Sequence, residues 1–127
     1  MSARDPLDLT GDWSGTYEYP RYFPRVAFTA SLAEQNGFVS GGVAETTLKG
    51  DRRATIEGRR DGAEVTWLKR YEHRDVAHDV QYEGVISGDG REISGRWAIF
   101  GNWSGVFQMV RQSRAAQALQ RRAAIEA

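Results

Sequence analysis

The chain has 127 residues, equal numbers of basic and acidic side chains (17 each), and no cysteine. This length suits one domain with its own core, and the charge balance gives no field to attract nucleic acid or an acidic membrane. The lack of cysteine excludes disulfides, thiolate metal sites and a cysteine nucleophile. The N-terminus has no apolar leader core and no apolar run approaches a membrane span, so we expect a cytoplasmic protein without a membrane partner.

The first predicted strand is Leu9–Tyr19, which follows a lead-in of residues 1–8 that we expect to be loose. Small or apolar residues alternate with polar ones along it, so one face suits a core and the other suits water. Trp13 and Tyr17 lie on the core face. Two prolines in Pro20–Arg25 then end the pattern.

Seven further strands are predicted from the same alternation, which gives eight at the spacing typical of an all-β barrel or sandwich. They lie at Val26–Glu34, Phe38–Thr46, Arg53–Arg60, Glu64–Glu72 and Asp79–Ser87, with the last two in Ile93–Arg111. The pair Gly41-Gly42 suggests a bulge or bend in the third strand. The first and last strands carry similar motifs, as expected where a sheet closes on itself.

The predicted connections alternate between tight and long. Asn36-Gly37, Asp61-Gly62 and Asp89-Gly90 are tight-turn sequences. The other connections are longer and are predicted at Pro20–Arg25, Thr47–Arg52 and His73–His78. Successive connections of an up-and-down barrel lie at opposite ends, so we predict one narrow end and one open mouth.

The predicted fold is therefore all-β: an eight-stranded antiparallel up-and-down barrel over residues 9–111, with a C-terminal α-helix. Residues 112–127 are rich in Ala, Arg and Gln and contain neither Gly nor Pro, which indicates that helix. Leu119 and Ile125 are its only large apolar side chains. Two interpretations stay open: a tail or helix that packs under the narrow end, or a partner-binding or oligomerising helix.

The pattern resembles the avidin and streptavidin family over roughly Leu9–Arg111. The residues that carry the resemblance are Leu9–Trp13, Val65–Tyr71, Tyr82–Gly84 and Ile93–Trp97. It implies an eight-stranded barrel with a ligand site at the open mouth, often in a homo-oligomer. In this family tryptophans wall the biotin site at the positions of Trp67 and Trp97.

The polar residues that bind biotin in that family are not matched. Gly15 stands where the first strand should offer an Asn, and Tyr19 stands in place of a Ser. Val43 and Glu45 replace a Tyr and a Ser of the third strand, and the last strand has no Asp. A site that loses its hydrogen-bonding groups loses most of its selectivity, so we do not expect biotin to be the ligand.

Inward residues near the mouth form the candidate ligand site. They are Tyr17, Tyr19, Trp67, Lys69, Tyr71, His78, Tyr82, Trp97 and Trp103. An aromatic cup with few polar groups is typical of small-molecule pockets, although the same aromatics could simply fill the core. Lys69 needs a counter-charge, a route to solvent or a ligand anion, and Glu45 or Glu34 could pair with it.

Three functions follow from these observations. The first is a non-enzymatic barrel that binds a small apolar or anionic ligand at its mouth, without a cofactor or metal. The second is an interaction or homo-oligomerisation module with a filled barrel, which uses an outward apolar stripe. That stripe consists of Val85, Ala98, Phe100, Val106 and Val110. The third is an enzyme that uses His78 and a mouth tyrosine for acid–base chemistry. No nucleic-acid partner is expected.

Overall fold

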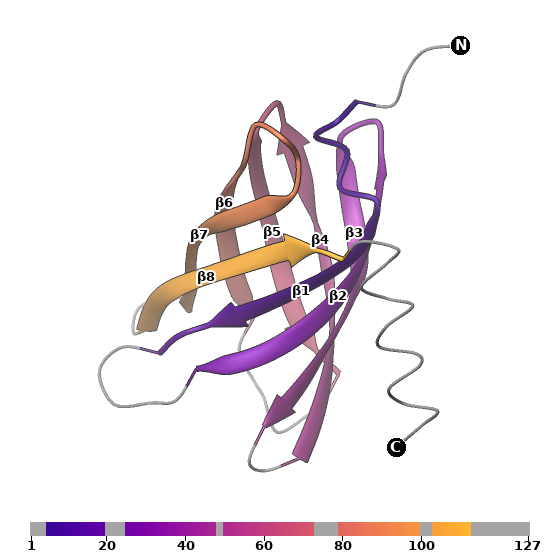
Figure 1. The fold of residues 1–127 in the computed structure, drawn as a ribbon. Helices are drawn as coiled ribbons and strands as arrows, with labels where there is room; N and C mark the ends of the chain where they lie inside the picture. The colour runs from indigo at the N-terminus through magenta and orange to yellow at the C-terminus, as the bar shows by residue number, and fades with distance from the viewer. Residues whose placement is uncertain (1–4, 20–24, 48–49, 73–78, 100–102, 113–127) are drawn as a thin grey trace, which may run out of the picture.

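The computed structural model describes residues 5–19, 25–47, 50–72, 79–99 and 103–112. They form one closed antiparallel barrel in which each strand pairs with the next along the chain and the last pairs with the first (Figure 1). The strands are β1 Gly11–Tyr17, β2 Val26–Gln35, β3 Phe38–Thr47, β4 Gly50–Asp61, β5 Glu64–Tyr71, β6 Val80–Ile86, β7 Glu92–Ile99 and β8 Trp103–Arg111. This confirms the all-β barrel prediction.

The first and last strands meet at the seam of the barrel, as their similar motifs predicted. Here β1 pairs with β8 from Trp13 opposite Arg111 to Tyr17 opposite Phe107. Alternate residues of every strand point inward and form a single apolar core. Because the alternation sets which side chains face inward, the register places Tyr17, Lys69 and Tyr82 inside the barrel.

The prediction of a loop at Thr47–Arg52 is wrong. The structure has β3 run to Thr47 and β4 begin at Gly50, with these two residues paired. The hydroxyl of Thr47 donates a hydrogen bond to the Gly50 carbonyl at 2.7 Å. The polar run reads as a loop in sequence, yet alternation continues through it: Asp51 and Arg53 are exposed while Arg52 is half-buried. The register places Arg52 opposite Glu45.

No bulge occurs at Gly41-Gly42, in contrast to the prediction. Pairing continues without interruption from Leu32 opposite Gly41 to Ser31 opposite Gly42. Gly41 instead marks a close approach, because a Cβ atom there would lie 2.1 Å from the Ser31 carbonyl oxygen. A Cβ at Gly42 would meet nothing within 4 Å. Gly41 therefore allows the close contact between β2 and β3, and the glycine pair does not break their ladder.

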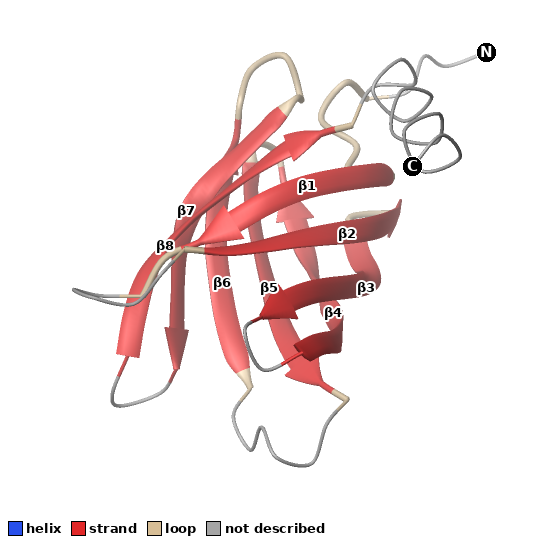
Figure 2. Ribbon diagram, turned by 60° about the horizontal axis from the view of Figure 1, so that its bottom comes forward, coloured by secondary structure: helices blue, strands red, loops and turns tan. Residues whose placement is uncertain are grey.

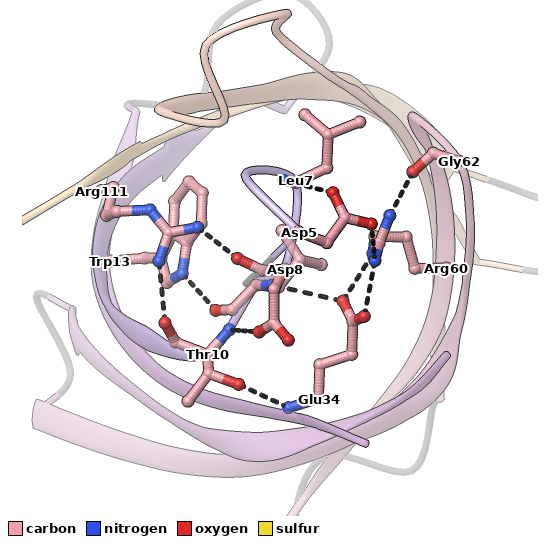
Figure 3. A network of polar contacts seen from close by, with 10 residues as sticks. Asp5, Leu7, Asp8, Thr10, Trp13, Glu34, Arg60, Gly62 and Arg111 are labelled. Atoms are coloured by element: carbon pink, nitrogen blue, oxygen red, sulfur yellow. Dashed lines mark hydrogen bonds and ion pairs between the residues drawn. The ribbon is translucent and has the colours of Figure 1, made fainter. Parts of the chain in front are cut away.

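The narrow end is closed by the segment before β1, which is not loose where the structure describes it (Figure 3). Leu9 is fully buried in the core, and Leu7 packs against it. Arg60 holds the segment through ion pairs to Asp5 at 2.9 Å and to Glu34 at 2.6 Å. Glu34 in turn accepts a hydrogen bond from the Leu9 amide at 3.2 Å.

Arg111 fixes the other side of this closure (Figure 3). Its guanidinium lies 4.5 Å from the centre of the buried Trp13 ring. It donates hydrogen bonds to the carbonyls of Asp8 at 2.6 Å and Thr10 at 2.8 Å. The Trp13 indole donates to the Leu9 carbonyl at 2.9 Å. Partners on the backbone of the closing segment thus satisfy both the cation and the indole.

The predicted loop at His73–His78 lies outside the described residues, and so does the predicted C-terminal helix apart from Gln112. Figure 2 shows that the described residues form strands and the loops that connect them. Within the ranges given above, no helix has the length and hydropathy needed to cross a bilayer.

A buried charge cluster as the candidate functional site

A lysine and a glutamate form an ion pair inside the open half of the barrel. Lys69 on β5 donates to Glu45 on β3 at 2.6 Å, and the side chains are 3% and 0% exposed. Both residues lie near the strand ends that lead toward the mouth, with Glu45 two residues before the end of β3 and Lys69 two before the end of β5. The pair is therefore buried close to the open end and far from the closed one.

Three tyrosine hydroxyls complete the hydrogen bonding of this pair. Tyr17 and Tyr71 each donate to the Glu45 carboxylate at 2.9 Å. Lys69 also donates to the Tyr82 hydroxyl at 2.9 Å. No buried side-chain nitrogen or oxygen in the described part of the chain lacks a partner. These five residues, called the charge cluster below, therefore satisfy one another's hydrogen-bonding groups.

 The members come from four strands: Tyr17 from β1, Glu45 from β3, Lys69 and Tyr71 from β5, and Tyr82 from β6.

The tyrosine rings also surround the lysine. The Lys69 ammonium lies 4.6 Å from the ring centres of Tyr17 and Tyr71 and 5.2 Å from that of Tyr82. A cation over an aromatic face is attracted to the ring electrons, and the attraction is stronger where water is excluded. Lys69 is therefore held by one carboxylate, one hydroxyl and three ring faces.

Burial shifts the protonation equilibria of the cluster. Desolvation lowers the pKa of Lys69 below its ordinary value, and the charge and hydrogen bond of Glu45 act in the opposite direction. Desolvation, followed by the Glu45 charge, raises the pKa of Tyr17 and Tyr71. The pKa of Tyr82 is raised mainly by desolvation as well. The three hydroxyls are therefore protonated at neutral pH, and those of Tyr17 and Tyr71 donate to Glu45.

This arrangement predicts that the folded protein loses stability at alkaline pH. Since the pKa of each cluster tyrosine is raised above 10.0, the unfolded chain ionises before the folded one. Each tyrosine should then remove about 1.4 kcal/mol of stability per pH unit above pH 10. The pKa of Lys69 is lowered, so burying its charged form reduces the free energy of unfolding at lower pH. This loss becomes smaller as the pH rises and is absent above the ordinary pKa of 10.5, where the lysine is neutral in the unfolded chain too. Stability should therefore fall steeply above this pH.

Urea denaturation at pH 8, 10 and 11 measures this effect. Tyr71→Phe should reduce the alkaline slope by about one third, because one of three ionising groups is removed. A free energy of unfolding that does not change between pH 10 and 11 would contradict the prediction.

Aromatic side chains extend from the cluster to the rim of the mouth. Tyr19 contacts Tyr17, Trp97 and Trp103 edge-on, with ring centres 5.7, 5.3 and 6.0 Å apart. The Trp97 indole donates a hydrogen bond to the Glu18 carbonyl at 3.0 Å. These rings form a continuous aromatic wall on the side of β1, β7 and β8.

The interior below the cluster is filled. A cavity of about 10 Å³ remains next to Lys69, between Phe28 and Trp67, which is room for about one water molecule. Trp67 stacks on Tyr82 with ring centres 5.6 Å apart. A Cβ at Gly15 would lie 2.5 Å from the Phe28 ring, so that ring occupies the space above Gly15. A ligand larger than water has no preformed cavity in this part of the barrel.

The structure brings together four of the nine site residues predicted from sequence. Tyr17, Lys69, Tyr71 and Tyr82 converge on Glu45, which was one of two candidate partners for the lysine. The other candidate, Glu34, binds Arg60 at the narrow end.

The remaining predicted residues lie apart from the charged centre. Tyr19 and Trp97 belong to the aromatic wall, and Trp67 lies beneath Tyr82. Trp103 begins β8 at the rim, where its ring contacts Tyr19 and its side chain is 41% exposed. His78 lies outside the described residues.

Two designed barrels of known structure share the fold of this chain. No protein-family model and no curated protein matches the sequence, so the avidin-like resemblance stays a prediction. A redesigned beta barrel is 10% identical with a TM-score of 0.72, over 83% of this chain and 92% of that chain. A de novo designed fluorescence-activating beta barrel is 11% identical with a TM-score of 0.62, over 81% and 93%. The siderocalin Ex-FABP is 13% identical with a TM-score of 0.41, over 96% and 83%.

Proposed function

We propose that this protein binds a small molecule with an apolar body and a carboxylate head at the open end of its barrel. The observation that carries the proposal is the buried Lys69–Glu45 pair with its ring of tyrosine hydroxyls. Apolar residues of similar volume often give equal or greater stability than a buried ion pair. A charge cluster near a barrel mouth is therefore better explained by recognition than by stability.

The hydrogen bonds to the Glu45 carboxylate support a carboxylate as the head group of the ligand. It takes hydrogen bonds from Tyr17, Lys69 and Tyr71, so these three side chains form a receptor for a carboxylate. The ligand head takes the place of the Glu45 carboxylate in this receptor. The ligand body lies along the aromatic wall toward the rim.

Binding requires Glu45 to leave Lys69, because the interior has no spare volume. Arg52 lies opposite Glu45 on β4 and is half-buried toward the mouth. Its guanidinium gives Glu45 a second cationic partner, so the displaced carboxylate stays neutralised. In the complex, Lys69 then pairs with the ligand carboxylate and Arg52 pairs with Glu45.

Native mass spectrometry of the gently purified protein, followed by fluorescence titration of its tryptophans, tests the proposal. Decanoate should bind, and decanol, which has the same chain without the charge, should bind about tenfold more weakly. Lys69→Met should remove this preference for the carboxylate. Arg70→Met is the matched control, since Arg70 is exposed on the same strand and should leave binding unchanged. No response to decanoate, decanol or biotin would overturn the proposal.

Homo-oligomerisation with a filled barrel is the second candidate function. Val85, Val106 and Val110 are 57%, 49% and 46% exposed on β6 and β8, where the sequence predicted an outward apolar stripe. Sedimentation at increasing protein concentration tests it, and a monomer at all concentrations would count against it.

A further inference from the structure

Lysine is rare in this chain, yet the cation buried in the barrel is a lysine. Of the 17 basic side chains 15 are arginine, and the two lysines are Lys49 and Lys69. Among the basic residues that the structure describes, only Lys69 is buried. Arginine suits a buried ion pair better, because its guanidinium is always charged and binds a carboxylate through two hydrogen bonds, as Arg60 does with Glu34. The lysine in the charge cluster therefore indicates a property that arginine lacks.

That property is nucleophilicity. An amine that has lost its proton carries a free electron pair, whereas a guanidinium keeps its proton in proteins. Desolvation lowers the pKa of Lys69, which makes this loss easier. The Glu45 carboxylate lies 2.6 Å from the Lys69 nitrogen, and the Tyr82 hydroxyl lies 2.9 Å from it. A proton acceptor and a hydroxyl group therefore both contact the same buried nitrogen.

We propose that Lys69 forms a reversible imine with an aldehyde that has a short apolar body. The aldehyde enters from the mouth, since Lys69 lies two residues before the end of β5 and its described partners are side chains that can change rotamer. The space beside Lys69, between Phe28 and Trp67, is about 10 Å³, which favours a short body over a long one. This inference goes beyond carboxylate binding and does not depend on it, because an aldehyde is uncharged and does not replace Glu45.

Residues of the charge cluster accept and return the protons of this reaction. The Lys69 ammonium gives a proton to Glu45, and the free electron pair of the amine attacks the carbonyl carbon. The carbonyl oxygen takes a second proton from the nitrogen, which Tyr82 is close enough to pass on, and a carbinolamine results. Glu45 returns its proton to the new hydroxyl, which leaves as water while the nitrogen electron pair forms the C=N bond. The iminium product keeps the single positive charge of Lys69.

The contacts that hold the ammonium also stabilise the iminium. Glu45 stays beside the nitrogen as its counter-charge, and the ring centres of Tyr17 and Tyr71 lie 4.6 Å from that nitrogen. Burial keeps water away from the C=N bond, whose hydrolysis reverses the reaction. An exposed lysine has none of these advantages, so the two kinds of lysine can be compared directly.

Reductive trapping with propanal tests the inference in the full chain. Sodium cyanoborohydride reduces the imine to a stable propylamine, and mass spectrometry of peptides gives the rate at each amine. Arg96→Lys supplies the matched control, an exposed lysine on β7 of the same molecule. At pH 7 Lys69 should be propylated about tenfold faster than the introduced lysine, because lowering a pKa by one raises the share of free amine about tenfold. In concentrated urea the two rates should become equal.

The outcomes of this experiment separate the imine from carboxylate binding. Equal rates in the folded chain, or a difference that persists in urea, would overturn the imine. Decanoate binding without faster propylation of Lys69 would also overturn it and would leave the carboxylate site standing. Faster propylation of Lys69 without any response to decanoate would support the imine and count against the carboxylate site.

Discussion

Glu45→Ala is expected to lower the free energy of unfolding by about 3–5 kcal/mol, the usual cost of removing one partner from a buried ion pair. The Lys69 ammonium, which is only 3% exposed, would lose its counter-charge. The hydroxyls of Tyr17 and Tyr71 would lose their acceptor. Urea denaturation at pH 7 measures the change. Glu57→Ala, an exposed glutamate on β4, is the control and should stay within about 0.5 kcal/mol of the parent.

Adding acetate separates a carboxylate receptor from a purely structural ion pair. In Glu45→Ala, acetate can occupy the vacated position between Lys69 and the tyrosines, and it should raise stability with its concentration. The parent and Glu57→Ala should show no such rise. A loss below about 1 kcal/mol, or a loss that acetate does not reduce, would contradict the receptor described above.

The two ends of the barrel use polar groups in different ways. At the narrow end Arg111 donates to backbone carbonyls of the closing segment, and these partners move only if the backbone moves. At the open end the partners of Lys69 and Glu45 among the described residues are side chains. Side chains can exchange partners by changing rotamer, so the polar contacts at the open end can rearrange without a movement of the backbone.

Alternation along the strands was sufficient to predict the barrel and most members of the charge cluster. It placed Lys69 on the same face as Trp67 and Tyr71, since side chains two residues apart share a face of a strand. It could not decide between Glu45 and Glu34 as the partner of Lys69. That choice depends on which strand ends meet, because Glu45 lies near the mouth and Glu34 near the closed end.

Features that depend on long-range contacts were not visible in the sequence. The lead-in is fixed by Arg60, which lies 55 positions from Asp5 along the chain. The filled interior results from the Phe28 ring packing over Gly15, which is a matter of volume and not of periodicity. The continuation of β4 into a charged run depends on pairing with β3, which overrides local preference.

Trp13→Ala is expected to lower the free energy of unfolding by about 3–5 kcal/mol, as for other fully buried aromatic residues. Trp13 is 0% exposed, and its loss leaves Arg111 without the ring it covers and the Leu9 carbonyl without its indole donor. Trp103→Ala is the matched control: this tryptophan is 41% exposed at the rim and should cost much less. Hydrogen exchange should show the largest loss of protection over residues 5–10 in Trp13→Ala. Equal costs for the two substitutions would mean that the closed end contributes no more to stability than the rim does.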